Sequence, residues 1–159
     1  MGGSADDSMG EAMLRYVAAA RPVQELISQT LTQVSGFALL LMTSHRCSVL
    51  AEGALAGACK AAAWAAEGVR ALNVPEAAAH HHHHLRGAAA ALGHACAAAQ
   101  SCSGSDPGDS RRSTLTRALR VSSDHLRGTA RLLPGFELVD CGQACCATHA
   151  PQRLLQEAT

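Results

Sequence analysis

Apolar side chains recur at steps of three and four along most of the chain, which is the spacing of amphipathic helices. Ser8 and Glu11 match a capping box and predict a first helix that starts at about residue 9. Pro22 interrupts the pattern and predicts the first turn of a second helix. That second helix has a continuous apolar stripe, made of Val23, Leu26, Ile27, Thr30, Val34, Phe37 and Leu41.

The same spacing predicts further helices over about 48–72, 75–101 and 113–133, and a weaker one over about 137–158 that Pro151 interrupts. Segments rich in Gly, Ser and Asp predict disorder at 1–7 and a flexible loop at 102–112. Because the remaining connections are short, successive helices are expected to be antiparallel neighbours. The sequence therefore predicts one all-α domain over 8–159, an up-and-down antiparallel bundle of five to six helices.

Alanine runs such as 88–91 strengthen this prediction, because alanine is the best helix former. A formal net charge of zero and an aromatic content of 3% disfavour nucleic-acid binding. The longest purely apolar stretch, residues 37–42, is too short to span a bilayer, so no membrane span is expected. The seven cysteines are irregularly spaced and no signal peptide precedes them, which favours reduced thiols and a cytoplasmic location.

Two groups of side chains are candidates for metal binding. The run 80–84 is five consecutive histidines, in which His80 and His84 lie one helical turn apart and could share a metal ion. Cys141, Cys145 and His149 are spaced by four residues and could hold zinc with a fourth ligand from elsewhere. The favoured interpretation is a solvated low-complexity run and unligated thiols, with zinc as the alternative.

Signatures of catalysis are missing. The sequence has no phosphate-binding loop, no nucleophile elbow and no zinc-protease helix, and its carboxylates are not paired for acid–base work. We therefore expect no enzymatic activity and no cofactor. Arg111 and Arg112 precede Thr114, which predicts a phosphorylation site at a helix start. The favoured alternative is that Ser110 or Ser113 caps this helix.

Small residues with large apolar residues at intervals form a stripe over the helices at 48–72 and 75–101. It comprises Leu55, Ala58, Cys59, Ala62, Ala63, Ala66 and Val69, and then Leu85, Ala88, Ala89, Leu92, Gly93, Cys96 and Ala99. This stripe resembles the Ala-rich helices of talin rod bundles, some of which bind vinculin. The predicted second and fifth helices are similar to those of vinculin and α-catenin bundles.

The resemblance implies a four- or five-helix bundle that acts as a cytoskeletal adaptor without catalysis. It makes Leu85, Ala88, Ala89, Leu92 and Cys96 candidates for partner binding, and core packing is the favoured alternative for each. The leading functional prediction is thus a non-enzymatic adaptor or scaffold for other proteins, among them cytoskeletal or adhesion components. A thin, alanine-rich core is also compatible with homo-oligomerisation. The alternative is a zinc-binding protein.

Overall fold

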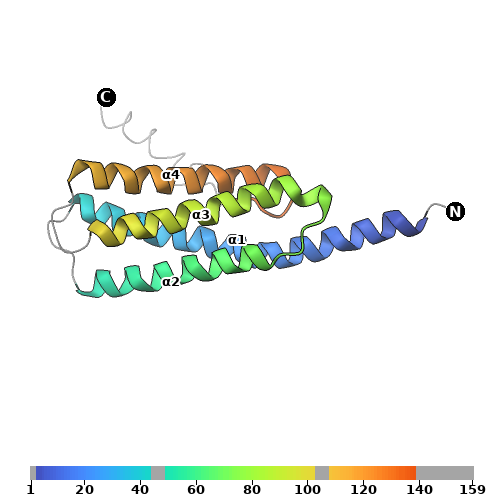
Figure 1. Ribbon diagram of the computed structural model, residues 1–159, viewed down its shortest axis with the longest axis horizontal. Helices are drawn as coiled ribbons and strands as arrows, with labels where there is room; N and C mark the ends of the chain where they lie inside the picture. Colours follow the sequence, from blue (N-terminus) through green and yellow to red (C-terminus); the bar gives the residue numbers. More distant parts are fainter. Residues whose placement is uncertain (1–2, 44–48, 103–107, 139–159) are drawn as a thin grey trace, which may run out of the picture.

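The computed structural model describes residues 3–43, 49–102 and 108–138. Within these ranges the chain forms four long helices and one short 3-10 turn and contains no strand. The elements are α1 (Gly3–Thr43), α2 (Val49–Ala71), η1 (Glu76–Ala78), α3 (Ala79–Cys102) and α4 (Asp109–Leu132). Successive helices run in opposite directions along one long axis (Figure 1). The all-α class is confirmed, whereas the predicted five to six helices are not, because the described residues contain four.

The largest difference is at Pro22, which lies inside α1 and does not begin a new helix. A proline in a helix interior removes one backbone hydrogen bond and normally kinks or breaks the helix. Here the buried stripe continues across it, through Tyr16 and Ala20 before the proline and Ile27 and Val34 after it. Packing on both sides therefore holds the helix together, and the exposed Pro22 faces solvent.

Several boundaries also differ from the sequence prediction. Helix α1 begins at Gly3, so residues 3–7 are helical and the start lies ahead of the predicted capping box. Helix α4 begins at Asp109 and its N-cap is Gly108, with no side-chain cap, so Ser110 and Ser113 do not cap it. The predicted loop 102–112 is narrower at both ends, and residues 103–107 lie outside the described ranges.

The predicted last helix, over about 137–158, is wrong at its start, because residues 137 and 138 are not helical. After α4 the chain turns at Gly135, whose φ of 86° lies in the left-handed region that favours glycine. Residues 136–138 then continue without helical structure, and Phe136 is buried with 2% of its surface exposed. The remainder of the predicted helix, residues 139–158, lies outside the described ranges.

Helix α3 is the centre of the bundle. It contacts α1, α2 and α4, and its contact with α4 is the most extensive in the molecule. Leu85, Ala88, Leu92, Ala95 and Ala99 of α3 are fully buried. Within the described ranges α2 and α4 do not contact each other, and α1 contacts α4 much less than α3 does. As a result, α4 is firmly packed on one side and loosely covered on the other.

Helix α1 is long and apolar on average, although its longest purely apolar stretch has only six residues. By length and composition alone, its residues 9–43 are long and apolar enough to cross a bilayer. The core helix of a bundle passes the same test, and one third of the apolar window is buried inside this molecule. Leu14 and Leu39 of the same helix are exposed. The expectation that the chain has no membrane span stays a prediction.

Candidate functional site

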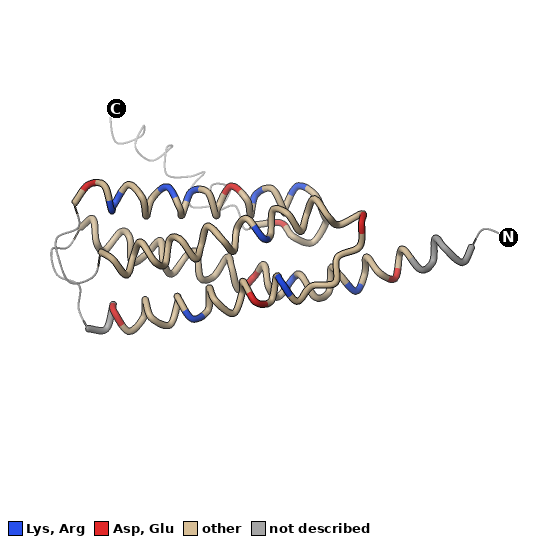
Figure 2. The backbone as a smooth tube through the Cα atoms, in the orientation of Figure 1, with Lys and Arg blue, Asp and Glu red and all other residues tan. Residues whose placement is uncertain are grey.

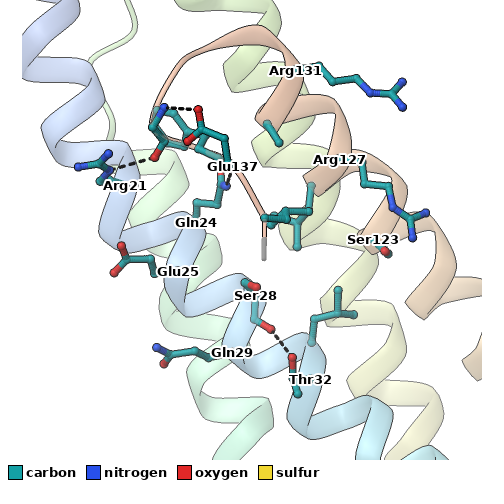
Figure 3. Close-up of a pocket in the computed structure, with 16 residues that line it drawn as sticks. Arg21, Gln24, Glu25, Ser28, Gln29, Thr32, Ser123, Arg127, Arg131 and Glu137 are labelled. Carbon is teal, nitrogen blue, oxygen red and sulfur yellow. Dashed lines mark hydrogen bonds between the residues drawn. The ribbon is translucent and has the colours of Figure 1, made fainter. Parts of the chain in front are cut away.

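A groove of about 960 Å³ lies between α1, the last turns of α4 and the chain that follows α4. We call this the α1–α4 groove. Its apolar floor is formed by Leu31, Leu126 and Leu138, of which Leu126 is buried and the other two are half-buried. Figure 3 shows Gln24, Ser28 and Thr32 along the α1 wall and Ser123, Arg127 and Arg131 along the α4 wall. The groove is thus apolar at its base and polar along both edges.

The chain after α4 closes one end of the groove. The amide nitrogen of Gln24 donates to the carbonyl of Phe136 at 2.8 Å, and Nε of Arg21 donates to the carbonyl of Gly135 at 3.0 Å (Figure 3). The Glu137 carboxylate accepts a hydrogen bond from the backbone N–H of Gly135 at 3.0 Å. That hydrogen bond is the main cause of the lowered pKa of Glu137. The first two contacts hold the turn against α1, and the third closes the turn on itself.

Helix α4, which forms one wall of the groove, is the most basic helix of the bundle. Helix α4 contains six arginines and two aspartates, which amounts to a net charge of +4, although the whole chain is neutral. Figure 2 shows basic residues spread along α4. Arg117, Arg120, Arg127 and Arg131 are exposed and follow one another at steps of three, seven and four, so they lie on one stripe. Arg127 and Arg131 lie where this stripe borders the groove.

One negative residue interrupts the stripe without neutralising it. Arg127 forms an ion pair with Asp124 at 3.1 Å, and both side chains are more than half exposed. Exposed ion pairs of this kind contribute at most about 1 kcal/mol, so Arg127 remains available to a stronger acidic partner. In Figure 3 Arg127 and Arg131 extend from α4 away from α1, along the outer edge of the groove. Sequence analysis missed the stripe because the net charge averages it with acidic residues elsewhere.

A buried polar contact lies at the same end of the bundle. The Tyr16 hydroxyl and Nδ1 of His81 are 2.8 Å apart, and the His81 ring packs edge-on against Phe136 with ring centroids 4.3 Å apart. Burial raises the pKa of Tyr16 to about 12. Burial, together with the neighbouring histidines His82 and His84, lowers the pKa of His81 to about 4. Both groups are therefore neutral near pH 7, and His81 serves as a core residue that ties α1 to α3.

The structure divides the histidine run by face. His81 is buried, His82 and His84 are half-buried, and His80 and His83 are exposed, so the prediction of a uniformly solvated run is wrong. His80 and His84 stack with ring centroids 5.0 Å apart, as the one-turn spacing predicted. Among the described residues no three His, Cys, Asp or Glu side chains already converge as a metal-binding group. Cys141, Cys145 and His149 lie outside the described ranges.

The structure also pairs His84 with a histidine from α4 that sequence analysis did not select. The tetrapeptide His-Leu-Arg-Gly occurs twice, at 84–87 in α3 and at 125–128 in α4. A Cβ atom added to Gly87 would lie 2.5 Å from the His125 ring, and one added to Gly128 would lie 2.5 Å from the His84 ring. Each histidine therefore packs over the glycine of the other copy. The repeated tetrapeptide was the signal in the sequence.

These reciprocal contacts, with the adjacent backbone, define what we call the α3–α4 seam. Its members are His84, Gly87, Ala88, Ser122, His125 and Gly128. The Nδ1 atoms of His84 and His125 are 3.2 Å apart, and the buried Ser122 hydroxyl donates to the carbonyl of Ala88 at 2.9 Å. Burial is the main cause of the lowered pKa of His84, and the nearby histidines add to it, His125 first. Because glycines face the rings, the two backbones approach closely here.

The residues that the sequence suggested for partner binding and for phosphorylation lie outside the groove and the seam or are buried in the core. Leu85, Ala88, Ala89, Leu92 and Cys96 are all buried in the core, where a partner reaches them only if the bundle opens. Thr114 is exposed, but α4 starts five residues earlier, so Thr114 does not lie at the helix start. Its hydroxyl donates to the carbonyl of Ser110. Burial, and then contact with Cys59, raises the pKa of Cys96 to about 12, which keeps this thiol protonated.

Comparisons of the chain with protein-family models, with curated proteins and with solved structures found no match. The arrangement of residues is therefore the basis for assigning a function. Of the surfaces described, the α1–α4 groove combines a hollow shape, an apolar floor and a charged edge, which are the features of a binding site. The residues along it offer hydrogen bonds and positive charge for recognition.

Proposed function

We propose that this protein is a non-enzymatic adaptor or scaffold that binds an acidic amphipathic helix of a partner protein in the α1–α4 groove. The observation that carries the proposal is an apolar groove bordered on one side by the arginine stripe of α4. Binding an amphipathic helix in a groove between helices is a recurring mode of recognition, in which apolar side chains enter the groove and charged flanks set the orientation.

The dimensions of the groove suit a short helix. Along α1 the lining runs from Arg21 to Thr32, which is about 16 Å of helix at 1.5 Å per residue. A partner segment of about three turns matches this length, with apolar residues at positions i, i+3 or i+4, and i+7. Such a contact is at the small end of protein interfaces, so we expect an affinity in the micromolar range.

The charges define the orientation of the partner helix. Arg127 and Arg131 border the groove on the α4 side, whereas Glu25 lines the α1 side and Glu137 lies at the closed end. A partner helix with carboxylates on the flank that faces α4 satisfies the arginines, and carboxylates on its other flank would meet Glu25. Charge pairs at the edge of an interface mainly govern specificity and the rate of association.

The resemblance to talin, vinculin and α-catenin bundles adds a class of partner to the proposal, because such adaptors connect cytoskeletal or adhesion proteins. We infer a cytoplasmic location as part of it. In support, Cys59, Cys96 and Cys102 are free thiols, which is the state that a reducing compartment maintains.

The test is a binding measurement with a panel of displayed helical peptides that share one apolar stripe and differ in flanking charge. We expect peptides with an acidic flank to bind and their charge-reversed counterparts to bind at least tenfold more weakly. Arg127→Glu with Arg131→Glu is expected to lower the affinity for the acidic peptides at least tenfold, because both arginines border the groove.

Arg117→Glu with Arg120→Glu is the matched control, since it reverses the same charge on the same helix outside the groove. We expect it to change the affinity less than threefold. Equal loss in both double variants would show that the peptides bind the stripe nonspecifically and would overturn the groove. The groove would also be ruled out as the binding site if anionic lipid vesicles bound the wild-type protein and competed with every peptide.

A further inference from the structure

From the α3–α4 seam we propose that His84 and His125 jointly bind one divalent transition-metal ion of the zinc class, with His80 as the third ligand. This site is independent of the groove, because none of the three histidines lines it. It also differs from a site made by the histidine run alone, since one ligand comes from another helix. The ion would link the second turn of α3 to the last two turns of α4, within the most extensive contact between helices in the molecule.

The distance between the two seam histidines fits this assignment. Zinc binds imidazole nitrogen at about 2.0–2.1 Å, so two nitrogens of a tetrahedral site lie about 3.3 Å apart. The Nδ1 atoms of His84 and His125 are 3.2 Å apart, with ring centroids at 5.3 Å. In the metal-free protein the same distance allows one ring to donate its Nδ1–H to the other. Metal binding replaces that single proton, which is the usual competition at histidine ligands.

The seam holds both rings in place before any ion arrives. Each ring lies over a glycine of the facing helix, so a side chain at either glycine would occupy the same space. The adjacent Ser122 hydroxyl bonds to the carbonyl of Ala88 and fixes the relative position of the two helices. Ligands positioned in advance bind an ion with less loss of conformational freedom than ligands on a flexible run.

His80 completes the proposed ligand set. It is exposed and lies one helical turn before His84, with ring centroids 5.0 Å apart. Because three ligands do not already converge in the described residues, His80 must turn about its side-chain bonds toward the ion, and water takes the fourth position. Imidazole ligands suit zinc, copper, nickel and cobalt, whereas magnesium and calcium need oxygen ligands that the seam does not offer.

The test uses the untagged full chain, purified without an immobilised-metal column and treated with a chelator, and titrates it with Co²⁺ and then Zn²⁺. Co²⁺ in a tetrahedral nitrogen site has a distinctive visible absorption, and Zn²⁺ displaces it. We expect saturable binding of one ion per chain. His125→Gln is expected to weaken the affinity at least tenfold and to remove the tetrahedral spectrum, although the histidine run is intact.

His94→Gln is the matched control, because it removes an exposed histidine of α3 that lies ten residues, or about 15 Å, beyond His84. It should change the affinity less than threefold. In case His125→Gln unfolds, Gly87→Ala retains all histidines but displaces the His125 ring, and should also weaken binding at least tenfold. Gly93→Ala, with open space at its Cβ, should not.

Three results would overturn the proposal. One is the absence of saturable Co²⁺ binding to the wild-type chain. Another is an affinity and spectrum that stay unchanged in both His125→Gln and Gly87→Ala, which would assign the ion to the run alone. The third is a Co²⁺ spectrum with thiolate charge-transfer bands that survives His125→Gln, which would assign the ion to cysteine ligands.

Discussion

Helix α4 faces two neighbours, and the two contacts differ in kind. Along the α3–α4 seam, glycines receive the opposing histidine rings and a buried serine bonds to the facing backbone. Along the α1–α4 groove the lining residues are longer and mostly polar, among them Ser28, Gln29 and Arg127, and the two helices leave a hollow between them. Packed interiors leave few voids, so small residues bring helices together, whereas long solvated side chains keep them apart. The same helix can thus be both a core element and the wall of a binding surface.

The largest effect expected from this comparison is a difference between two leucines. Leu85→Ala removes a side chain that is completely buried in α3, next to the seam, and should destabilise the protein by about 2–5 kcal/mol. Leu31→Ala, at the half-buried floor of the groove, should destabilise it by about 1 kcal/mol, because water already reaches that side chain. Chemical denaturation of both variants measures this. Equal losses would contradict the distinction between a packed seam and an open groove.

The second prediction concerns pH and the buried contact of His81 at the closed end of the groove. Its folded-state pKa of about 4 lies below the usual value of 6.5, so folding favours the neutral ring. The stability from this group is complete above pH 6.5 and is lost as the pH falls toward 4. The loss is at most about 3 kcal/mol, at about 1.4 kcal/mol per pKa unit. Denaturation at several pH values between 7.5 and 4.5, with a chelator present, measures the slope.

The control for this slope is Tyr16→Phe with His81→Phe, which replaces both hydrogen-bonded partners by apolar rings. This double variant should show a smaller loss of stability between pH 6.5 and pH 4.5 than the wild type. His82 and His84 also have lowered pKa values and would account for the remainder. An unchanged slope would mean that folding does not lower the pKa of His81.

The third and smallest effect is a change in stability that has opposite signs when two different glycines of α3 are replaced by alanine. Gly87→Ala should destabilise the protein by about 1–3 kcal/mol, because the new Cβ would meet the His125 ring and force the seam apart. Gly93→Ala has open space and should stabilise it by about 0.5–1 kcal/mol through helix propensity. Thermal unfolding of the two variants compares them directly. If both substitutions stabilised the protein, the His125 ring would be able to move away from position 87 without loss of stability.

The sequence predicted the helical class and most of the buried stripe, because three-and-four spacing directly reports the face that a helix buries. Ile27, Val34, Leu85 and Leu92 were selected as apolar-stripe positions and are core residues. It failed at Pro22, where the local rule predicts a break and packing on both sides maintains one helix. It also failed at Gly108, where the backbone begins α4 with no side-chain cap.

The candidate sites were less predictable than the core. His80 and His84 were chosen for their spacing within one helix, and that pair does stack. His125 was not chosen, because its proximity to His84 depends on how α3 and α4 pack, and the two are 41 residues apart in the sequence. The groove was not predicted either, because no local pattern in the sequence indicates where two packed helices leave a hollow between them.

The sequence by itself determined that this chain is helical, which face of each helix is apolar and which residues are small enough for close packing. These properties follow from local chemistry, namely side-chain entropy, periodicity and size. Only the tertiary structure decided that two His-Leu-Arg-Gly copies pack reciprocally, that His81 is buried against Tyr16 and that the arginines of α4 border a groove. Those are relations between distant segments, and they are set by which helices share a core.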